Sequence, residues 1–393
     1  MYRGYKIVAN SAAGRRRYMQ WLVPYVIACE EIDRYDIWIH THNGADIEFF
    51  KQLAGAFPKV NLVWQPNGEV KNISTINPFY RFCCEDKTIY IKLDDDIVWM
   101  ENDTLRKLID FRIDHPEYFL ISPLVINNAQ STYLLQVCNK IHLNTYYKSH
   151  ADGDVLWRSG KFAADLHQWF LDNYLKTGRY TELHVGAHPT AMTRFSINSI
   201  LWFGEDLQAI KGEIPGDDEE FMSCIYPTRL GKANCFLGDT IMAHFAFFTQ
   251  REQLDKQNIL KQYGEILDRI WKTDEIYRPI HERIQTIVKN IDTHETELMK
   301  RPSPYTHGTP DPVYKLTIRN RLFTFLPKSF QKAWELQKKR KASRNDPIYT
   351  LRITQRIPEY NGKRFTYNYS CRLDRLFKGY CYFVSHYRTL YLL

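Results

Sequence analysis

The sequence predicts an α/β fold in which a mainly parallel, Rossmann-like sheet forms a sandwich with its connecting helices. Apolar runs alternate with amphipathic stretches four times before residue 97, and such alternation is typical of βαβ units. The fourth apolar run, residues 88–93, leads directly into three consecutive carboxylates, Asp94, Asp95 and Asp96. Because ligands bind beyond the carboxyl ends of parallel strands, we expect this acidic triplet at the functional edge of the sheet.

The hydrophobic periodicity sets the positions of the expected elements. Strands are predicted at residues 6–10, 35–42, 60–64, 88–93, 118–122 and 193–203. Helices are predicted at residues 15–31, 45–56, 77–84, 103–114 and 163–174, and a further helix opens with acidic residues after Gly216. Residues 11–14 are small, and we expect them to form a turn after the first strand.

Length and composition exclude several classes of protein. A chain of 393 residues with 44% hydrophobic residues can bury a large core and is globular rather than disordered. No stretch approaches the ~20 apolar residues of a membrane-spanning helix, and the first residues enter a strand pattern rather than a signal peptide. The eight cysteines lack metal or redox spacing, so free thiols in the cytoplasm are expected.

Charge divides the chain into a body and a tail. Residues 1–250 hold the α/β pattern, residues 251–300 are expected to be a helical extension, and residues 301–393 form a basic, aromatic C-terminal region. The last region has 19 Lys and Arg residues against five Asp and Glu residues, although the whole chain has a net charge of only +8. The tail is therefore expected to meet an anionic partner.

Two later motifs join the acidic triplet in one chemical constellation. Residues 216–221, Gly-Asp-Asp-Glu-Glu-Phe, open a helix with carboxylates, and residues 242–245, Met-Ala-His-Phe, place His244 in an apolar run. Three adjacent carboxylates repel one another and resist burial unless a cation joins them, and oxygen ligands of this kind suit Mg²⁺ or Mn²⁺. The plainer alternatives are an exposed acidic turn, an ordinary helix cap and a hydrogen-bonded core histidine.

The order of these motifs resembles that of the GT-A glycosyltransferases, over residues 5–250. Residues 92–97, Lys-Leu-Asp-Asp-Asp-Ile, are similar to the family's Asp-x-Asp motif, residues 216–221 to its later acidic motif, and residues 242–245 to its C-terminal histidine. The resemblance implies a nucleotide-binding half over residues 1–100 and an acceptor half over residues 101–250. It also implies a UDP-sugar or related donor, a glycan or lipid-linked glycan acceptor, and Mn²⁺ or Mg²⁺ as cofactor.

The resemblance assigns roles to individual residues. Asp96 and His244, together with Asp94, would hold the metal that neutralises the departing diphosphate. Asp218 would be the base that deprotonates the acceptor, kept ionised by the helix dipole, and direct displacement with such a base inverts the anomeric centre. The candidates for donor binding are Ala9, Asn10, Ser11, Arg15, Arg81, Asp94 and Asp95. A solvated basic helix start is the alternative for Arg15 and the two arginines that follow it.

Other polar and aromatic residues are candidates for the walls of the pocket. His184 and His188 have helical metal-ligand spacing, but Gly186 and Pro189 argue against a helix, so a loop at the pocket is expected. The candidate sugar platform consists of Asp154, Trp157, Arg158 and Trp202. For Trp202, packing in the core is the favoured alternative.

The C-terminal tail is expected to bind a membrane surface. Residues 322–334 are apolar and aromatic and precede the basic cluster 338–341, which is typical of a segment on an anionic membrane surface. A cytoplasmic protein on the inner face of the membrane is therefore expected, in preference to a nucleic-acid-binding one.

Two other functions are rivals to a glycosyltransferase. One rival is a sugar-phosphate nucleotidyltransferase, but residues 9–17 lack its glycine-rich, lysine-containing loop. The other is an inactive carbohydrate- or membrane-binding scaffold, against which the intact Asp96 and Asp218 argue.

Overall fold

The computed structural model describes residues 1–393 except 72–74, 150, 152–153, 307–352, 357–365 and 370–393. The chain divides into two compact units, residues 1–308 and 309–393. In the second unit, the described residues form the antiparallel strands β10 (Ile353–Arg356) and β11 (Thr366–Tyr369). The apolar and basic segment predicted to bind membranes, 322–341, lies outside the described residues. Among the described helices, none combines the length and the apolar character needed to cross a bilayer.

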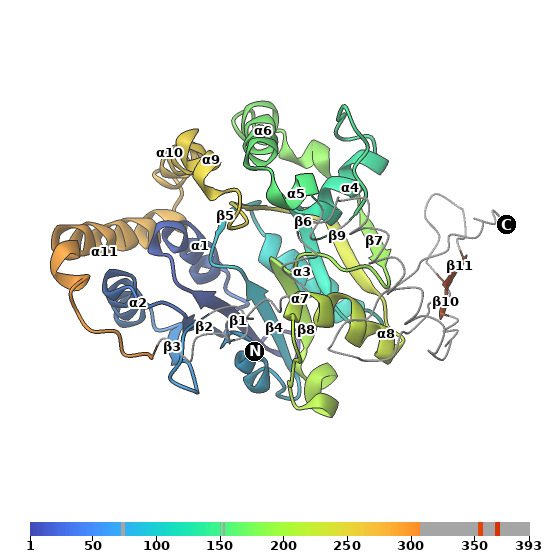
Figure 1. The fold of residues 1–393 in the computed structure, drawn as a ribbon, viewed down its shortest axis with the longest axis horizontal. Coiled ribbons are helices and arrows are strands. Elements are labelled where there is room, and N and C mark those ends of the chain that lie inside the picture. Colours follow the sequence, from blue (N-terminus) through green and yellow to red (C-terminus); the bar gives the residue numbers. More distant parts are fainter. Residues whose placement is uncertain (72–74, 150, 152–153, 307–352, 357–365, 370–393) are drawn as a thin grey trace, which may run out of the picture. The chain divides into compact units, whose positions relative to one another are not determined.

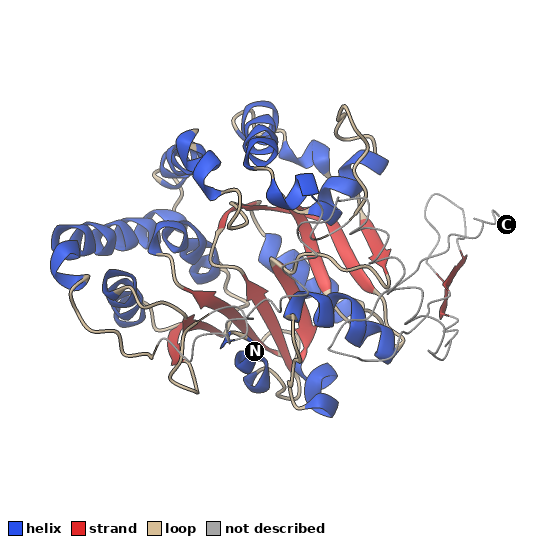
Figure 2. Cartoon of the chain, viewed as in Figure 1, coloured by secondary structure: helices blue, strands red, loops and turns tan. Residues whose placement is uncertain are grey.

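The first unit is built on a nine-stranded sheet with helices packed around it (Figure 2). The strands are β1 (Lys6–Ala13), β2 (Arg34–Ile39), β3 (Val60–Trp64), β4 (Thr88–Leu93), β5 (Ile97–Met100), β6 (Ile121–Ile126), β7 (Ala187–Thr190), β8 (Ser199–Phe203) and β9 (Asn234–His244). Their order is β3-β2-β1-β4-β8-β6-β9-β5, and β7 also pairs with β9. Strands β1 to β4, β6 and β9 share one direction, so the sheet is mostly parallel, as the sequence predicts.

The helices bury their apolar stripes on this sheet or on one another. They are α1 (Arg16–Ala28), α2 (Gly44–Ala56), α3 (Thr104–Asp114), α4 (Ala129–Val137), α5 (Asp154–Arg158), α6 (Gly160–Phe170), α7 (Asp218–Glu220), α8 (Tyr226–Leu230), α9 (Arg251–Lys256), α10 (Ile259–Trp271) and α11 (Tyr277–Leu298). Helices α1, α2 and α11 pack together, and α3 packs on β6, β8 and β9 (Figure 1). In α10, the buried Ile259, Tyr263 and Leu267 recur at four-residue spacing, as an amphipathic helix requires. The helices expected at 251–300 belong to the first compact unit.

Several predicted boundaries are wrong because strand pairing decides where an element ends. Strand β1 continues to Ala13, which pairs with Ile39 of β2, so residues 11–13 are strand rather than turn. The strand predicted at 193–203 is limited to Ser199–Phe203, where it pairs with β4. The helix predicted at 77–84 is a 3₁₀ turn, Asn77–Phe82. The strand predicted at 118–122 begins later and extends to Ile126, because β6 pairs with β9 over that length.

A short segment after α11, residues 299–306, fastens the C-terminal part of this unit to β2 and β3. The Tyr305 hydroxyl donates to the carbonyl of Ile39 at 2.8 Å and accepts from the amide of Gln65 at 3.1 Å. Arg301 forms an ion pair with Glu48 of α2 at 3.0 Å. We call this segment the strap, and it joins the end of α11, which packs on α1 and α2, to β2 and to the residue after β3.

Candidate active site

The acidic triplet forms the turn between β4 and β5. Strand β4 ends at Leu93, and the Asp94 amide then donates to the carbonyl of Asn198 at 2.8 Å. The amide of Ile97 donates back to the Asp94 carbonyl at 3.2 Å, which closes the turn and starts β5. Asp94 and Asp96 are therefore brought together by a turn rather than by the alternation of a continuing strand.

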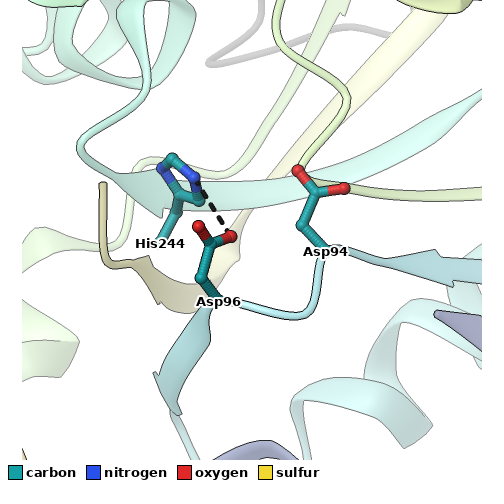
Figure 3. A group of neighbouring side chains, drawn as sticks. All are labelled: Asp94, Asp96 and His244. Atoms are coloured by element: carbon teal, nitrogen blue, oxygen red, sulfur yellow. Dashed lines mark ion pairs between the residues drawn. The ribbon is translucent and has the colours of Figure 1, made fainter. Parts of the chain in front are cut away.

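The pairing of β5 with β9 brings His244 to the triplet. Ile97 is the register partner of His244, and the Phe245 amide donates to the Asp96 carbonyl at 2.8 Å. The His244 Nε2 atom lies 3.3 Å from Asp96 Oδ1, and Asp94 faces the same point (Figure 3). One ligand atom from each of Asp94, Asp96 and His244 lies within 4.8 Å of the others.

This donor set fits a hard divalent cation. The two carboxylates suit Mn²⁺ or Mg²⁺, which complete their coordination with water or substrate oxygens, and the imidazole nitrogen is a ligand better suited to the transition metal Mn²⁺ than to Mg²⁺. The buried Nδ1 atom of His244 has no hydrogen-bond partner among the described residues, so no second contact fixes the tautomer of the ring.

Cationic side chains surround the triplet. Lys92 pairs with Asp94, which also accepts from the Asn198 side-chain amide at 3.1 Å. Arg15 pairs with Asp95 and lies 3.1 Å from Asp96. Since Asp96 is only 2% exposed, burial raises its pKa, but the charges of Arg15, His244 and Arg251 outweigh burial and hold that pKa well below its usual range.

Asp95 joins the end of β1 to the end of β4. Its carboxylate accepts from the backbone amide of Gly14 at 2.9 Å, in addition to the contact with Arg15. These two residues directly follow Ala13, the last residue of β1. The carboxyl ends of two neighbouring parallel strands thus meet at the triplet, as the position of the motif predicts.

The three donor-site candidates in β1 lie inside the strand rather than beyond its end. Ala9, Asn10 and Ser11 are all buried. Asn10 accepts from the indole nitrogen of Trp38 at 3.2 Å, and Ser11 is hydrogen-bonded to the Tyr35 hydroxyl at 2.8 Å. Their side-chain partners are therefore core residues of β2.

The candidate Arg81 lies on the surface, where it forms an ion pair with Glu213 at 2.8 Å. No contact in the described part of the chain joins Arg81 to the triplet.

Asp218 occupies the first position of α7 and is almost buried. The preceding Asp217 caps the helix by accepting from the Glu220 amide at 3.0 Å. Tyr80 donates its hydroxyl to Asp218 Oδ2 at 3.0 Å. Burial raises the pKa of Asp218 above its ordinary value, and the charge of Lys92 and the Tyr80 hydrogen bond counteract only part of that effect. Among these influences on the pKa of Asp218, burial is the largest.

Glu219 is a titratable residue beside the proposed base that sequence reasoning did not single out. It forms an ion pair with Arg194 at 2.9 Å. Burial raises the pKa of Glu219 to about 7, and the negative charge of Asp217 adds to the rise while Arg194 opposes it. Its place next to Asp218 in the motif was the available signal.

Aromatic residues follow His244 and continue the wall of the site. Phe247 packs against the His244 ring with centroids 4.7 Å apart, and Phe248 packs edge-on against Trp157 at 5.1 Å. Phe248 is 67% exposed. Trp202 is different: it is buried and stacks on Tyr90, so it belongs to the core and is not part of a sugar platform.

The remaining histidine candidates lie in other contacts. His184 Nε2 is 2.9 Å from the buried carboxylate of Glu101, and His188 contacts the Val185 carbonyl at 2.7 Å. His184 lies outside regular structure and His188 lies in β7, so they are not a helical pair.

Comparisons with known proteins give structural similarity at low sequence identity. No family model matches this chain, and no curated protein matches it. Residues 1–349 of S. aureus TarS align over 96% of this chain and 98% of that chain, with 8% identity and a TM-score of 0.38. Glucosyl-3-phosphoglycerate synthase from Mycobacterium tuberculosis, solved with Mn²⁺, UDP-glucose and phosphoglyceric acid, aligns over 68% and 79%, with 11% identity and a TM-score of 0.36.

A third similar structure has a different named activity. 4-Diphosphocytidyl-2C-methyl-D-erythritol synthase from Anaerococcus prevotii aligns over 66% of this chain and 99% of that chain, with 11% identity and a TM-score of 0.36. At such scores these similarities assign neither a family nor an activity to this chain.

Proposed function

We propose that this chain is an inverting, metal-dependent glycosyltransferase of the GT-A type. It would transfer a sugar from a nucleotide-diphosphate donor, a UDP-sugar, to a glycan or lipid-linked glycan acceptor. The proposal is supported best by one observation: His244 at the end of β9 meets Asp94 and Asp96 of the turn after β4, and their ligand atoms lie within 4.8 Å of one another. That position is the ligand edge of a parallel sheet.

The donor side of the mechanism uses the triplet and its basic neighbours. Asp94, Asp96 and His244 would hold Mn²⁺ or Mg²⁺, and the ion would neutralise charge on the departing diphosphate. Arg15 would add a fixed positive charge beside it, because Asp95 holds its guanidinium.

Buried residues would support the donor site from behind. We assign Ala9, Asn10 and Ser11 to the strand beneath the nucleotide site, where the hydrogen bonds to Trp38 and Tyr35 hold β1 against β2. Arg81 would contact the donor only after release from Glu213.

The acceptor side of the mechanism relies on Asp218. Its carboxylate would take the proton from the acceptor hydroxyl as that oxygen attacks the anomeric carbon, and the bond to the diphosphate would break on the opposite face. Such a single displacement inverts the configuration at that carbon. The burial that raises the pKa of Asp218 strengthens it as a base, because a catalytic base works best with a pKa near the working pH.

Calorimetric titration with UDP, with and without Mn²⁺, tests the donor proposal. We expect UDP binding that requires Mn²⁺ and is lost in Asp96→Ala. Asp172→Ala is the control, since Asp172 is an exposed carboxylate paired with Lys176. An affinity for UDP that is the same with and without Mn²⁺, or that is unchanged in Asp96→Ala, would contradict the proposal. Product analysis separates the rival activity, because a nucleotidyltransferase releases pyrophosphate and a glycosyltransferase releases the nucleotide.

The basic tail motivates a second, separate proposal of membrane attachment. Residues 301–393 hold the excess positive charge, which suits an anionic membrane surface on the cytoplasmic side. Flotation with anionic liposomes tests this by comparing the full chain with a chain that ends at Gly308. Ending it earlier would remove the strap with Tyr305 and disturb the first unit. Equal flotation of the two chains would contradict the proposal.

A further inference from the structure

The three carboxylates of the triplet already have an equal number of cationic partners. Lys92 pairs with Asp94, and Arg15 pairs with Asp95 and contacts Asp96. The third partner is Arg251, the first residue of α9, whose guanidinium lies 3.7 Å from Asp96 Oδ2. The contacting Asp, Lys and Arg side chains thus carry three negative and three positive charges.

Burial makes this balance matter. Asp95, Asp96 and Lys92 are each less than a tenth exposed. The side chains of Arg15 and Arg251 are 29% and 37% exposed, so solvent screens them in part. Because the carboxylates between them are buried, an unbalanced charge at this point is still costly. A divalent cation that enters alone leaves two positive charges uncompensated beside Arg15 and Arg251. A divalent cation that enters with a diphosphate diester, which carries two negative charges, leaves the balance unchanged.

Each of the two guanidiniums has an N–H group that no described residue satisfies. Arg15 Nη1 and Arg251 Nε are buried atoms without a hydrogen-bond partner among the described residues. A guanidinium can hold a carboxylate with some of its five N–H groups and a phosphate oxygen with the others. Arg15 is fixed in place because its guanidinium also lies over the Tyr18 ring, 5.1 Å from the centroid.

We propose that Arg15 and Arg251 make metal binding conditional on the donor, so that the site takes the cation and the diphosphate diester of the sugar nucleotide as an electrically neutral pair. This inference rests on the proposed function and deepens it. The two arginines weaken the binding of the cation alone, and their remaining donors strengthen the binding of the cation together with the diphosphate. By thermodynamic linkage, UDP strengthens Mn²⁺ binding by the same factor as Mn²⁺ strengthens UDP binding.

Titration of Mn²⁺, followed by the electron paramagnetic resonance signal of the free ion, tests this without an activity assay. The probe is UDP, which supplies the two phosphates of the donor and one further negative charge on its terminal phosphate. The wild-type chain should bind Mn²⁺ weakly alone and about 10- to 100-fold more tightly with saturating UDP, the range of typical coupling between sites. In Arg251→Gln, Mn²⁺ alone should bind about tenfold more tightly and UDP with Mn²⁺ about tenfold more weakly, which reduces the coupling.

Two further variants separate charge from folding and from geometry. Lys256→Gln removes one positive charge from the same helix, where Lys256 is exposed and pairs with Glu252, and it should leave both affinities unchanged. Arg15→Lys keeps the charge but loses the planar fork, so Mn²⁺ alone should still bind weakly while UDP with Mn²⁺ binds more weakly than in the wild type.

The outcomes distinguish this inference from the proposed function. Tight Mn²⁺ binding by the wild-type chain without UDP, or an unchanged Mn²⁺ affinity in Arg251→Gln, overturns the inference and leaves a metal-dependent transferase in place. A wild-type chain that binds neither Mn²⁺ nor UDP in any combination overturns both.

Discussion

Replacing Tyr80 with phenylalanine isolates one hydrogen bond at the proposed base. The Tyr80 hydroxyl donates to Asp218 Oδ2 at 3.0 Å, and Tyr80 is fully buried. Because this donation stabilises the carboxylate form, its loss should raise the pKa of Asp218 further. A hydrogen bond to a charged group contributes about 1.5–3 kcal/mol, and one pKa unit corresponds to about 1.4 kcal/mol. The expected rise is therefore about 1–2 units.

The pH dependence of kcat/KM, measured by release of the donor nucleotide, reports this shift. A base works in its ionised form, so activity falls as the pH drops through its pKa. In Tyr80→Phe the acidic limb should move to higher pH by about 1–2 units, and activity above it should change little. Tyr90→Phe is the control, since Tyr90 stacks on the same Trp202 but accepts from the Glu85 amide. An acidic limb that stays in place would refute the assignment of Asp218.

Three other substitutions have defined outcomes. Asp218→Asn should lower turnover by at least about 10²-fold while UDP affinity stays near normal, measured by steady-state kinetics and calorimetry; retained turnover would place the base elsewhere. Burial lowers the pKa of His167 in the folded chain to about 4. As the pH falls from about 6.5 towards 4, the unfolded chain binds a proton on this residue before the folded chain does, so the free energy of unfolding decreases. Between pH 7 and pH 5, the free energy of unfolding measured with urea should decrease by about 2 kcal/mol less in His167→Gln than in the wild type, and an unchanged pH dependence would contradict this. A Cβ at Gly44 would lie 2.1 Å from the carbonyl of Leu298, so Gly44→Ala should destabilise the chain by about 1–3 kcal/mol. The control Gly55→Ala, in the same helix and in open space, should stabilise it by about 0.5–1 kcal/mol, and equal melting temperatures for the two variants would exclude a steric cause.

The sequence predicts much of the fold because its first half obeys local rules. The strand at Val60–Trp64 and the helix at Gly44–Ala56 follow directly from apolar periodicity, and Asn43 caps that helix as its side chain allows. The end of β1 was misplaced because small residues after Asn10 favour a turn locally. Pairing with β2 keeps them extended, and no local pattern contains that pairing.

The site was predictable in its acidic members and less so in its basic ones. The spacing of motifs indicates that Asp96 and His244 share a site, but their contact depends on the register of β5 with β9, which is a long-range pairing. The sequence marks Lys92 as a candidate member of the site, because it is the charged residue in an otherwise uncharged, buried strand. Arg251 left none, because it is one charge among many in a polar helical stretch and only the fold brings it to Asp96.

The strap has a consequence for how the chain acquires its structure during synthesis. The Ile39 carbonyl and the Gln65 amide both bond to Tyr305, and 240 residues separate Gln65 from that tyrosine. At about 5–20 residues per second, a ribosome needs roughly 12–48 s to add them. The first strands therefore emerge long before their last partners exist. Until Tyr305 is synthesised, the Ile39 carbonyl and the Gln65 amide lack this partner, and a chaperone or another strand has time to bind them.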